Sequence, residues 1–261
     1  MIKLIASDLD GTLLQNGAQE LDPIIFDQIR TLKENGIHFA AASGRQYPNL
    51  RRLFAPVQDD ISYIAENGSL CVHDGKVLSR GLIPRDLGNR IVDAIHQCSG
   101  CECIISGEKV CYSDSVNEEF RYHMLHVMKN DMKFVDSIDE IQEHYLKIAV
   151  CNFNGTKDCL AYFQKLFSSE IKVVTSGNIW VDFIAPDANK GTALHTLLDY
   201  LHILPEECVA FGDQYNDVEM LQLAGISYAM SSAAPGISFY STYVTDSVSD
   251  VLDDIISSTS I

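Results

Sequence analysis

Basic residues are scarce in this chain of 261 residues. Lysine and arginine together number 19, against 36 aspartates and glutamates, which gives a formal net charge of −17. Non-specific nucleic-acid binding needs a basic face that displaces counterions, and docking on an anionic membrane needs a basic patch. The sequence therefore argues against nucleic-acid and membrane partners. An acidic protein that binds a phosphate must supply positive charge locally, from a divalent cation or a few basic side chains.

Long hydrophobic runs are absent as well. A transmembrane helix takes about 20 consecutive apolar residues, and no segment approaches that length. The N-terminal segment MIKLIASDLDGTLL is only briefly apolar before Ser7 and Asp8, which is unlike a signal peptide. Repeats and low-complexity segments are absent, and 46% of the residues are hydrophobic. We therefore expect a globular cytoplasmic protein that is a monomer or a weak homodimer.

Eight cysteines are present, and in the cytoplasm they are expected to be reduced thiols, mostly buried as small apolar residues. Cys98, Cys101 and Cys103 lie close together in the sequence and could form a soft-metal site. The spacing lacks a second clean pair of ligands, so we favour a structural interpretation.

The first part of the chain is typical of a parallel α/β domain. Residues 2–7 form an apolar run, as in a strand buried on both faces. Asp22-Pro23 then predicts the start of a helix, with an apolar stripe at Ile25, Ile29 and Leu32. Further strands are expected at 37–42, near 63–65, at 208–211 and at 226–230, and helices at 48–54 and from residue 190, with two weak helical stretches at the end. A Glu66-Asn67-Gly68 turn is expected after the strand near 63–65, and residues 70–72 and 77–78 are expected to pair as a hairpin across Asp74-Gly75.

From about residue 82 the pattern changes to antiparallel strand pairs mixed with helices. Strand pairs are expected at 103–106 with 110–112 and at 172–175 with 179–184, a strand at 145–151, and helices at 86–98, 117–128 and 157–167. This pattern indicates an inserted α+β module. We expect a catalytic α/β core at residues 1–81 and 188–261, and a second domain at 82–187.

Polar, glycine-containing turns follow three of the predicted core strands. They are Asp8-Leu9-Asp10-Gly11-Thr12, Ser43-Gly44-Arg45, and Gly212-Asp213 with Asn216-Asp217. Ligands bind at the carboxyl ends of strands in open parallel sheets, so we expect these turns to converge. Carboxylates packed together repel one another, and a hard cation such as Mg²⁺ relieves this repulsion. We expect side-chain ligation by Asp8 and Asp213, the backbone carbonyl of Asp10 as a further ligand, and Asp217 to hold a metal-bound water.

These residue types suit phosphoryl transfer. A carboxylate at Asp8 could attack phosphorus, and Asp10 could act as acid and then base. Thr12 could hydrogen-bond Asp10. The hydroxyl of Ser43, the amide of Gly44 and the charge of Lys190 at a helix start could bind phosphate oxygens. Taken singly, most of these motifs favour a structural role, as a turn, a helix cap or a solvated helix entry. Their joint occurrence, in order after apolar strands, favours function.

Together these motifs resemble those of the haloacid dehalogenase superfamily. Asp8-x-Asp10-Gly11-Thr12 is similar to its first motif, Ser43-Gly44-Arg45 to its second, Lys190-Gly191 to its third, and Gly212-Asp213-x-x-Asn216-Asp217 to its fourth. The spacing of the motifs, with roughly a hundred residues between the third strand and Lys190, resembles that of the Cof-type phosphatases, whose cap domain is inserted there. The resemblance implies a Rossmann-like core with a parallel sheet and an inserted α+β cap domain. It also implies Mg²⁺ bound by Asp8, Asp10 and Asp213, and phosphate bound by Ser43, Gly44, Lys190 and Asn216.

The prediction is a magnesium-dependent phosphatase of a small phosphorylated metabolite, such as a sugar phosphate, that works through an aspartyl-phosphate on Asp8. The placing of Arg45 beside Ser43 favours a sugar phosphate. Two alternatives stay open at this point. A phosphomutase would use the same Asp8 without releasing phosphate, and a non-catalytic phosphometabolite-binding protein would need the same pocket without turnover.

Overall fold

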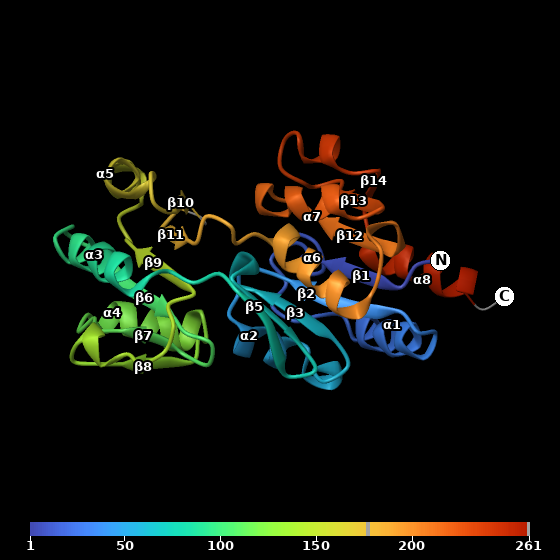
Figure 1. The fold of residues 1–261 in the computed structure, drawn as a ribbon, viewed down its shortest axis with the longest axis horizontal. Helices are drawn as coiled ribbons and strands as arrows, with labels where there is room; N and C mark the ends of the chain where they lie inside the picture. The colour runs from blue at the N-terminus through green and yellow to red at the C-terminus, as the bar shows by residue number, and fades with distance from the viewer. Residues whose placement is uncertain (176–177, 260–261) are drawn as a thin grey trace. The chain divides into compact units, whose positions relative to one another are not determined.

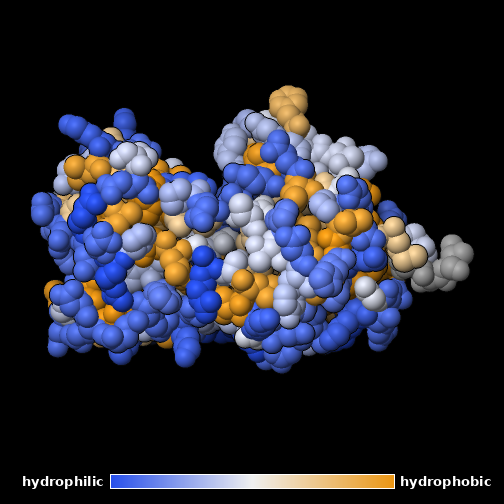
Figure 2. All heavy atoms as spheres, viewed as in Figure 1, coloured by the Kyte–Doolittle hydropathy of each residue, from blue (hydrophilic) through white to orange (hydrophobic). Residues whose placement is uncertain are grey.

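The computed structural model describes residues 1–175 and 178–259 and divides into two compact units (Figure 1). The core unit comprises Met1–Arg80 and Asn189–Ile261, and the inserted unit comprises Gly81–Ala188. The inserted unit is thus one continuous stretch of chain. Hydrophilic side chains cover much of the face drawn in Figure 2, with hydrophobic side chains interspersed among them.

An eight-stranded sheet forms the centre of the core unit, with the strand order β14-β13-β12-β1-β2-β3-β4-β5. The six strands from β14 to β3 are parallel, whereas β3, β4 and β5 pair antiparallel. The strands are β1 (Leu4–Ser7), β2 (His38–Ala42), β3 (Ser62–Ala65), β4 (Leu70–His73), β5 (Lys76–Arg80), β12 (Cys208–Gly212), β13 (Ile226–Met230) and β14 (Tyr243–Thr245). The sheet confirms the predicted mixed α/β class with a parallel-rich core.

Helices cover this sheet because its central strands are apolar on both faces. Leu4, Ala6 and Ala210 pack in one hydrophobic cluster with residues of α6 (Lys190–Leu201) and α7 (Val218–Leu223). The other helices are α1 (Pro23–Glu34), α2 (Tyr47–Leu53) and α8 (Val248–Thr259), of which α1 contacts β2 and α8. Asp22 caps α1 as predicted, because its side chain accepts a hydrogen bond from the amide of Ile24.

The inserted unit is built on a second, six-stranded sheet with the order β10-β11-β9-β6-β7-β8. Its strands are β6 (Glu102–Ser106), β7 (Cys111–Ser113), β8 (Met132–Phe134), β9 (Lys147–Cys151), β10 (Lys172–Thr175) and β11 (Trp180–Ile184), and its helices are α3 (Arg85–His96), α4 (Glu118–Tyr122) and α5 (Lys157–Phe167). A hydrophobic core of its own, including Ile91, Ile105, Phe163 and Phe183, lies between this sheet and its helices. Among the residues described, no helix is long and apolar enough to cross a membrane.

Three elements differ from expectation. The helix predicted over 117–128 is α-helical only to Tyr122 and continues as a π-helical turn over His123–Val127. The strands β8 and β14 were not predicted. Both have three residues and lie at the edge of a sheet, so they have little of the burial from which a strand pattern is recognised.

Candidate active site

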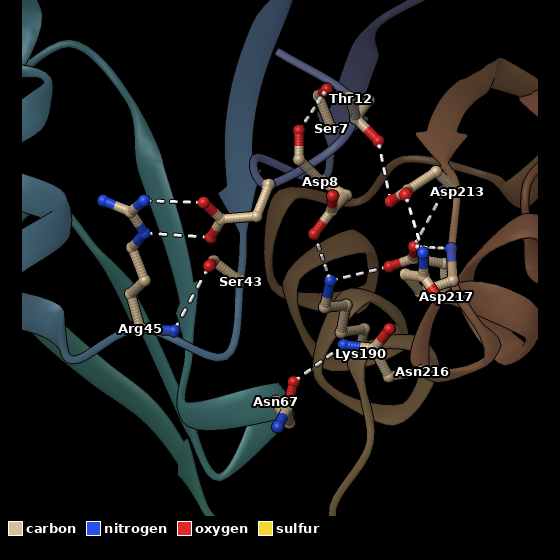
Figure 3. A network of polar contacts seen from close by, with 12 residues as sticks. Ser7, Asp8, Thr12, Ser43, Arg45, Asn67, Lys190, Asp213, Asn216 and Asp217 are labelled. Carbon is tan, nitrogen blue, oxygen red and sulfur yellow. Dashed lines mark hydrogen bonds and ion pairs between the residues drawn. The ribbon is translucent and has the colours of Figure 1, made fainter. Parts of the chain in front are cut away.

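The three polar turns meet at one edge of the core sheet (Figure 3). They follow the carboxyl ends of β1, β2 and β12, and β1 lies between β12 and β2. The amide of Asp8 donates a hydrogen bond to the carbonyl of Phe211 at 3.0 Å, which fixes Asp8 beside the end of β12. Because parallel strands end at the same edge, the topology brings residues about 200 positions apart into contact.

A buried lysine joins two of the acids. Lys190, at the start of α6, has no exposed surface, and its Nζ lies 2.5 Å from Oδ1 of Asp8 and 2.6 Å from Oδ1 of Asp217. The other oxygen of Asp217, Oδ2, accepts hydrogen bonds from the amides of Asp213 and Gln214, both at 3.0 Å. Asp217 therefore positions Lys190 and stabilises the turn after β12, and each of its carboxylate oxygens accepts at least one hydrogen bond.

Electrostatics in this cluster are set mainly by burial. Burial raises the pKa of Asp8 from its usual 3.8 to about 8; the charge of Lys190 opposes this, and Asp217 and Asp213 add to it. Burial also raises the pKa of Asp213, against a hydrogen bond from Gln214. Burial alone would lower the pKa of Lys190, but Asp217 and Asp8 raise it, so the lysine stays charged. With one buried lysine among three carboxylates, the cluster lacks positive charge.

A hard divalent cation fits this cluster. Asp8, Asp213 and Asp217 each offer a carboxylate oxygen, and these oxygens lie within 4.8 Å of one another; within the described part of the chain this is the only such group of three. Oδ2 of Asp8 is buried and has no hydrogen-bond partner among the described residues. Oxygen-only donors suit Mg²⁺ better than zinc or copper. Asp217 is engaged by the charge of Lys190 and by two amides, whereas Asp213 accepts hydrogen bonds from neutral side chains only. Asp8 and Asp213 could therefore hold the cation.

Gly11 and Thr12 shape the approach to Asp213. A Cβ at Gly11 would lie 2.2 Å from Oδ2 of Asp213, and the φ of Gly11 is +95°, so only glycine fits both the space and the backbone. The hydroxyl of Thr12 donates to Oδ1 of Asp213 at 3.3 Å. The expected hydrogen bond from Thr12 to Asp10 was therefore wrong, because Thr12 bonds to Asp213 across the sheet.

Asp10 is held apart from this cluster by Arg45. The guanidinium of Arg45 makes two hydrogen bonds to the carboxylate of Asp10, from Nε at 2.9 Å and from Nη2 at 2.6 Å. About half of the side-chain surface of Asp10 is exposed, at 55%. Arg45, which we considered as a substrate contact, is thus engaged with Asp10 in this structure. Sequence spacing gave no sign of this bidentate pair.

The other predicted phosphate ligands lie along the same edge. Ser43 is buried after β2, and its Oγ accepts a hydrogen bond from the amide of Arg45 at 3.2 Å. A Cβ at Gly44 would lie 3.0 Å from Oδ1 of Asn67. Asn216 is exposed, and its Nδ2 donates to Oδ1 of Asn67 at 2.9 Å. Asn67 was expected only as part of a turn, so the structure adds it to the site.

The cysteine cluster has no comparable geometry. All eight cysteines are free thiols, and Cys103 is fully buried in the core of the inserted unit, where burial raises its pKa. Cys98 and Cys101 pack against the same core. Within the described ranges, these cysteines do not form a potential metal group, since the aspartate cluster is the only one found.

Comparisons with known proteins agree with this geometry. Residues 5–253 match the haloacid dehalogenase-like hydrolase family. The 5-amino-6-(5-phospho-D-ribitylamino)uracil phosphatase of Escherichia coli K12 is 29% identical over 264 residues, covering 98% of this chain and 96% of the relative. The HMP-PP phosphatase of Cronobacter sakazakii is 26% identical over 252 residues, covering 90% of this chain and 86% of the relative. A crystal structure from Eubacterium rectale superposes with a TM-score of 0.87 at 30% identity, covering 97% of this chain and 99% of that one. The chain therefore belongs to the haloacid dehalogenase-like hydrolases, in the Cof-type group.

Proposed function

We propose that this protein is a magnesium-dependent phosphatase that hydrolyses a small phosphomonoester through an aspartyl-phosphate on Asp8. One observation carries the proposal. Oδ1 of Asp8 lies 2.5 Å from Nζ of the buried Lys190, whereas Oδ2 is buried without a hydrogen-bond partner among the described residues. A buried polar atom without a partner is costly, and such atoms are typical of sites that bind a ligand or react.

The chemistry proceeds in two displacements. An oxygen of Asp8 forms a bond to phosphorus while the ester P–O bond breaks, and the leaving oxygen takes a proton from Asp10. In the second step Asp10 takes a proton from water as the water oxygen attacks phosphorus. The Asp8–phosphorus bond then breaks, and inorganic phosphate leaves with Asp8 restored.

Proton transfer requires a change at Asp10. The two hydrogen bonds from Arg45 stabilise the ionised carboxylate, which cannot donate a proton. We infer that Asp10 leaves Arg45 when substrate is bound. Its position two residues after Asp8, at the end of β1, supports this role.

Binding of the phosphoryl group is assigned to Ser43, Gly44, Lys190 and Asn216. Lys190 contributes a fixed charge, and the start of α6 favours anions. The magnesium ligands are Asp8, Asp213 and the backbone carbonyl of Asp10. When bound, the cation would neutralise the carboxylates and stabilise charge on the phosphoryl oxygens.

The names of two relatives support a substrate class. Both curated relatives are phosphatases of small phosphorylated metabolites by their names. We infer the same class for this chain, with a sugar phosphate or a comparable phosphomonoester as the substrate.

The test is a phosphatase screen on small phosphomonoesters, with Mg²⁺ and with a chelator, comparing the wild type with Asp8→Asn. We expect phosphate release that needs Mg²⁺ and a loss of about 10³-fold or more in Asp8→Asn, because a nucleophile has no substitute. Asp22→Asn is the matched control, since it makes the same chemical change at the N-cap of α1 and asparagine also caps helices. It should retain wild-type activity.

Trapping identifies the intermediate. Acid quenching during turnover, followed by borohydride reduction, would convert an aspartyl-phosphate to homoserine, which mass spectrometry can locate at residue 8. Undiminished turnover in Asp8→Asn would refute the nucleophile. Isomerised sugar phosphate without release of inorganic phosphate would identify a mutase instead.

A further inference from the structure

A turn with unusual backbone geometry lies between β3 and β4. Glu66, Asn67 and Gly68 have consecutive φ values of 50°, 56° and 94°. For residues with a side chain this left-handed region costs about 1–2 kcal/mol each. Two such residues in succession persist only where the surroundings hold them, and strained backbone of this kind gathers at functional sites.

The surroundings that hold this turn are the proposed phosphate-binding elements. The amide of Glu66 donates to the carbonyl of Arg45, and the amide of Asn67 donates to the carbonyl of Ser43, both at 3.0 Å. On the other side, a Cβ at Gly68 would lie 2.1 Å from the carbonyl oxygen of Asn189, the residue before Lys190. The turn is thus wedged between the loop after β2 and the start of α6.

This position directs the side chain of Asn67 into the site. Asn67 and Asn216 point toward one another beside Lys190 (Figure 3), and Oδ1 of Asn67 accepts a hydrogen bond from Nδ2 of Asn216 at 2.9 Å. Asn67 also lies against Gly44. A carboxamide has two N–H donors and one carbonyl acceptor. Oδ1 of Asn67 is used in this bond, whereas its Nδ2 donates to none of the described residues, so its N–H groups remain donors for a ligand.

The cost of burying a second charged side chain beside Lys190 favours neutral donors here. The buried positive charge of the site, Lys190, is already shared by the carboxylates of Asp8 and Asp217. A phosphoryl group brings further negative charge and three oxygens that need donors. Carboxamide N–H groups can donate to them without the desolvation cost of a second buried cation.

We propose that Asn67 is a further phosphate-binding residue, whose amide donates to a non-reacting phosphoryl oxygen and fixes Asn216 for the same anion. The inference rests on the proposed function, since it assigns a ligand to the same phosphoryl group. It accounts for the ties of the turn to both neighbouring phosphate-binding elements.

The test uses Asn67→Gly and Asn67→Asp in the full-length protein with Mg²⁺. Glycine keeps the left-handed backbone while removing the amide, and aspartate keeps the shape while replacing the donor with a negative charge. The probe is inorganic orthophosphate, measured as a competitive inhibitor and by calorimetry. We expect Asn67→Gly to weaken orthophosphate binding by about 10- to 100-fold, the effect of losing a hydrogen bond to a charged group, and Asn67→Asp to weaken it further.

The matched control is His202→Gly. His202 also has a left-handed backbone, with φ 56°, but it lies at the opposite end of α6 from Lys190. This variant should bind orthophosphate like the wild type. A double-mutant cycle with Asn216→Ala should be non-additive, because the two amides act as a pair.

The outcomes separate this inference from the proposed function. If Asn67→Gly changes the melting temperature but leaves orthophosphate binding unchanged, Asn67 is only a structural residue and the inference is overturned. Additive effects of Asn67→Gly and Asn216→Ala would refute the pairing. If the wild type itself fails to bind orthophosphate and releases no phosphate, the proposed function falls and this inference falls with it.

Discussion

At the scale of the residue, Gly11 is tightly constrained against Asp213. Its φ is +95°, and an added Cβ would lie 2.2 Å from Oδ2 of Asp213. We expect Gly11→Ala to displace Asp213 and to weaken Mg²⁺ binding by about 10- to 100-fold, as disturbing the orientation of a metal ligand typically does. Calorimetric titration with Mg²⁺ measures this.

Gly17→Ala is the control that separates a clash of the added Cβ from backbone strain in that experiment. Gly17 also has a positive φ, of +75°, but an added Cβ there would meet nothing within 4 Å. Both variants should lose stability, because alanine is strained at positive φ. Only Gly11→Ala should lose Mg²⁺ affinity, and an equal loss in Gly17→Ala would contradict the packing argument.

The raised pKa of Asp8 predicts how pH affects stability and metal binding. Because burial raises this pKa from 3.8 to about 8, the folded protein holds a proton that the unfolded chain releases. The stabilising contribution is complete below the unfolded pKa, near pH 4, and is lost as the pH rises to about 8. In chelator, the melting temperature of the wild type should therefore fall over this window relative to Asp8→Asn.

Mg²⁺ should reverse this trend, because the cation needs the ionised carboxylate. The apparent affinity for Mg²⁺ should rise by roughly tenfold per pH unit below the pKa of Asp8. Thermal melts at several pH values, with chelator and with Mg²⁺, measure both effects. A difference between the wild type and Asp8→Asn that does not vary with pH would show that Asp8 keeps an ordinary pKa.

Sequence reasoning identified the acids of the site but not their partners. Asp8, Asp213 and Lys190 were predicted because each begins a turn or helix after an apolar strand. The pairing of Asp10 with Arg45, and that of Asp217 with Lys190, depends on side-chain directions between loops 27 or more residues apart. Asn67 was missed for the same reason, because its contacts with the carbonyl of Ser43 and the side chain of Asn216 join segments far apart in the sequence.

At the scale of the element, the start of α6 links stability to chemistry. Asn189 caps the helix: its side chain accepts from the amide of Thr192 at 2.8 Å, and the hydroxyl of Thr192 accepts from the amide of Asn189 at 3.2 Å. This capping box sets the first turn, which carries Lys190 into the site. Removing the cap should therefore change the position of Lys190 relative to Asp8.

We expect Asn189→Ala to lower the free energy of unfolding by about 0.5–2 kcal/mol, the usual cost of a lost N-cap. It should also lower activity by about tenfold or more, since small displacements of catalytic groups are costly. Asp22→Ala removes the corresponding cap of α1 and serves as the control. Denaturant unfolding should give similar losses for both variants. If Asp22→Ala loses as much activity as Asn189→Ala, the lost activity of Asn189→Ala reflects lower stability and not a displaced Lys190.

Elements with a strong period or a cap were predictable, and short edge elements were not. The prediction of α5 matches its bounds, and the hairpin of β4 and β5 follows from Asp74-Gly75, both with positive φ as a type I′ turn requires. The strands β8 and β14 have three residues each, so their pairing is decided by the neighbouring strand. The π-helical turn after α4 likewise has no local signal in the sequence.

At the scale of the whole molecule, each unit has its own sheet and hydrophobic core. We expect residues 81–188 expressed alone to fold cooperatively, because a domain of about 100 residues with its own core is of typical independent size. Circular dichroism with thermal melting tests this. Retained helix without a cooperative transition would mean that the inserted unit depends on the core unit.

The attachment of the insertion to the core has a practical consequence. Arg80, where the chain leaves the core sheet, pairs with Leu70, and Asn189, where it returns, lies against Gly68. The residues where the chain leaves and re-enters the core unit therefore both lie against the short segment 68–70. A brief glycine-rich linker could join them and replace the insertion, and the same two junctions could accept an insertion grafted from a relative while the three polar turns stay in place.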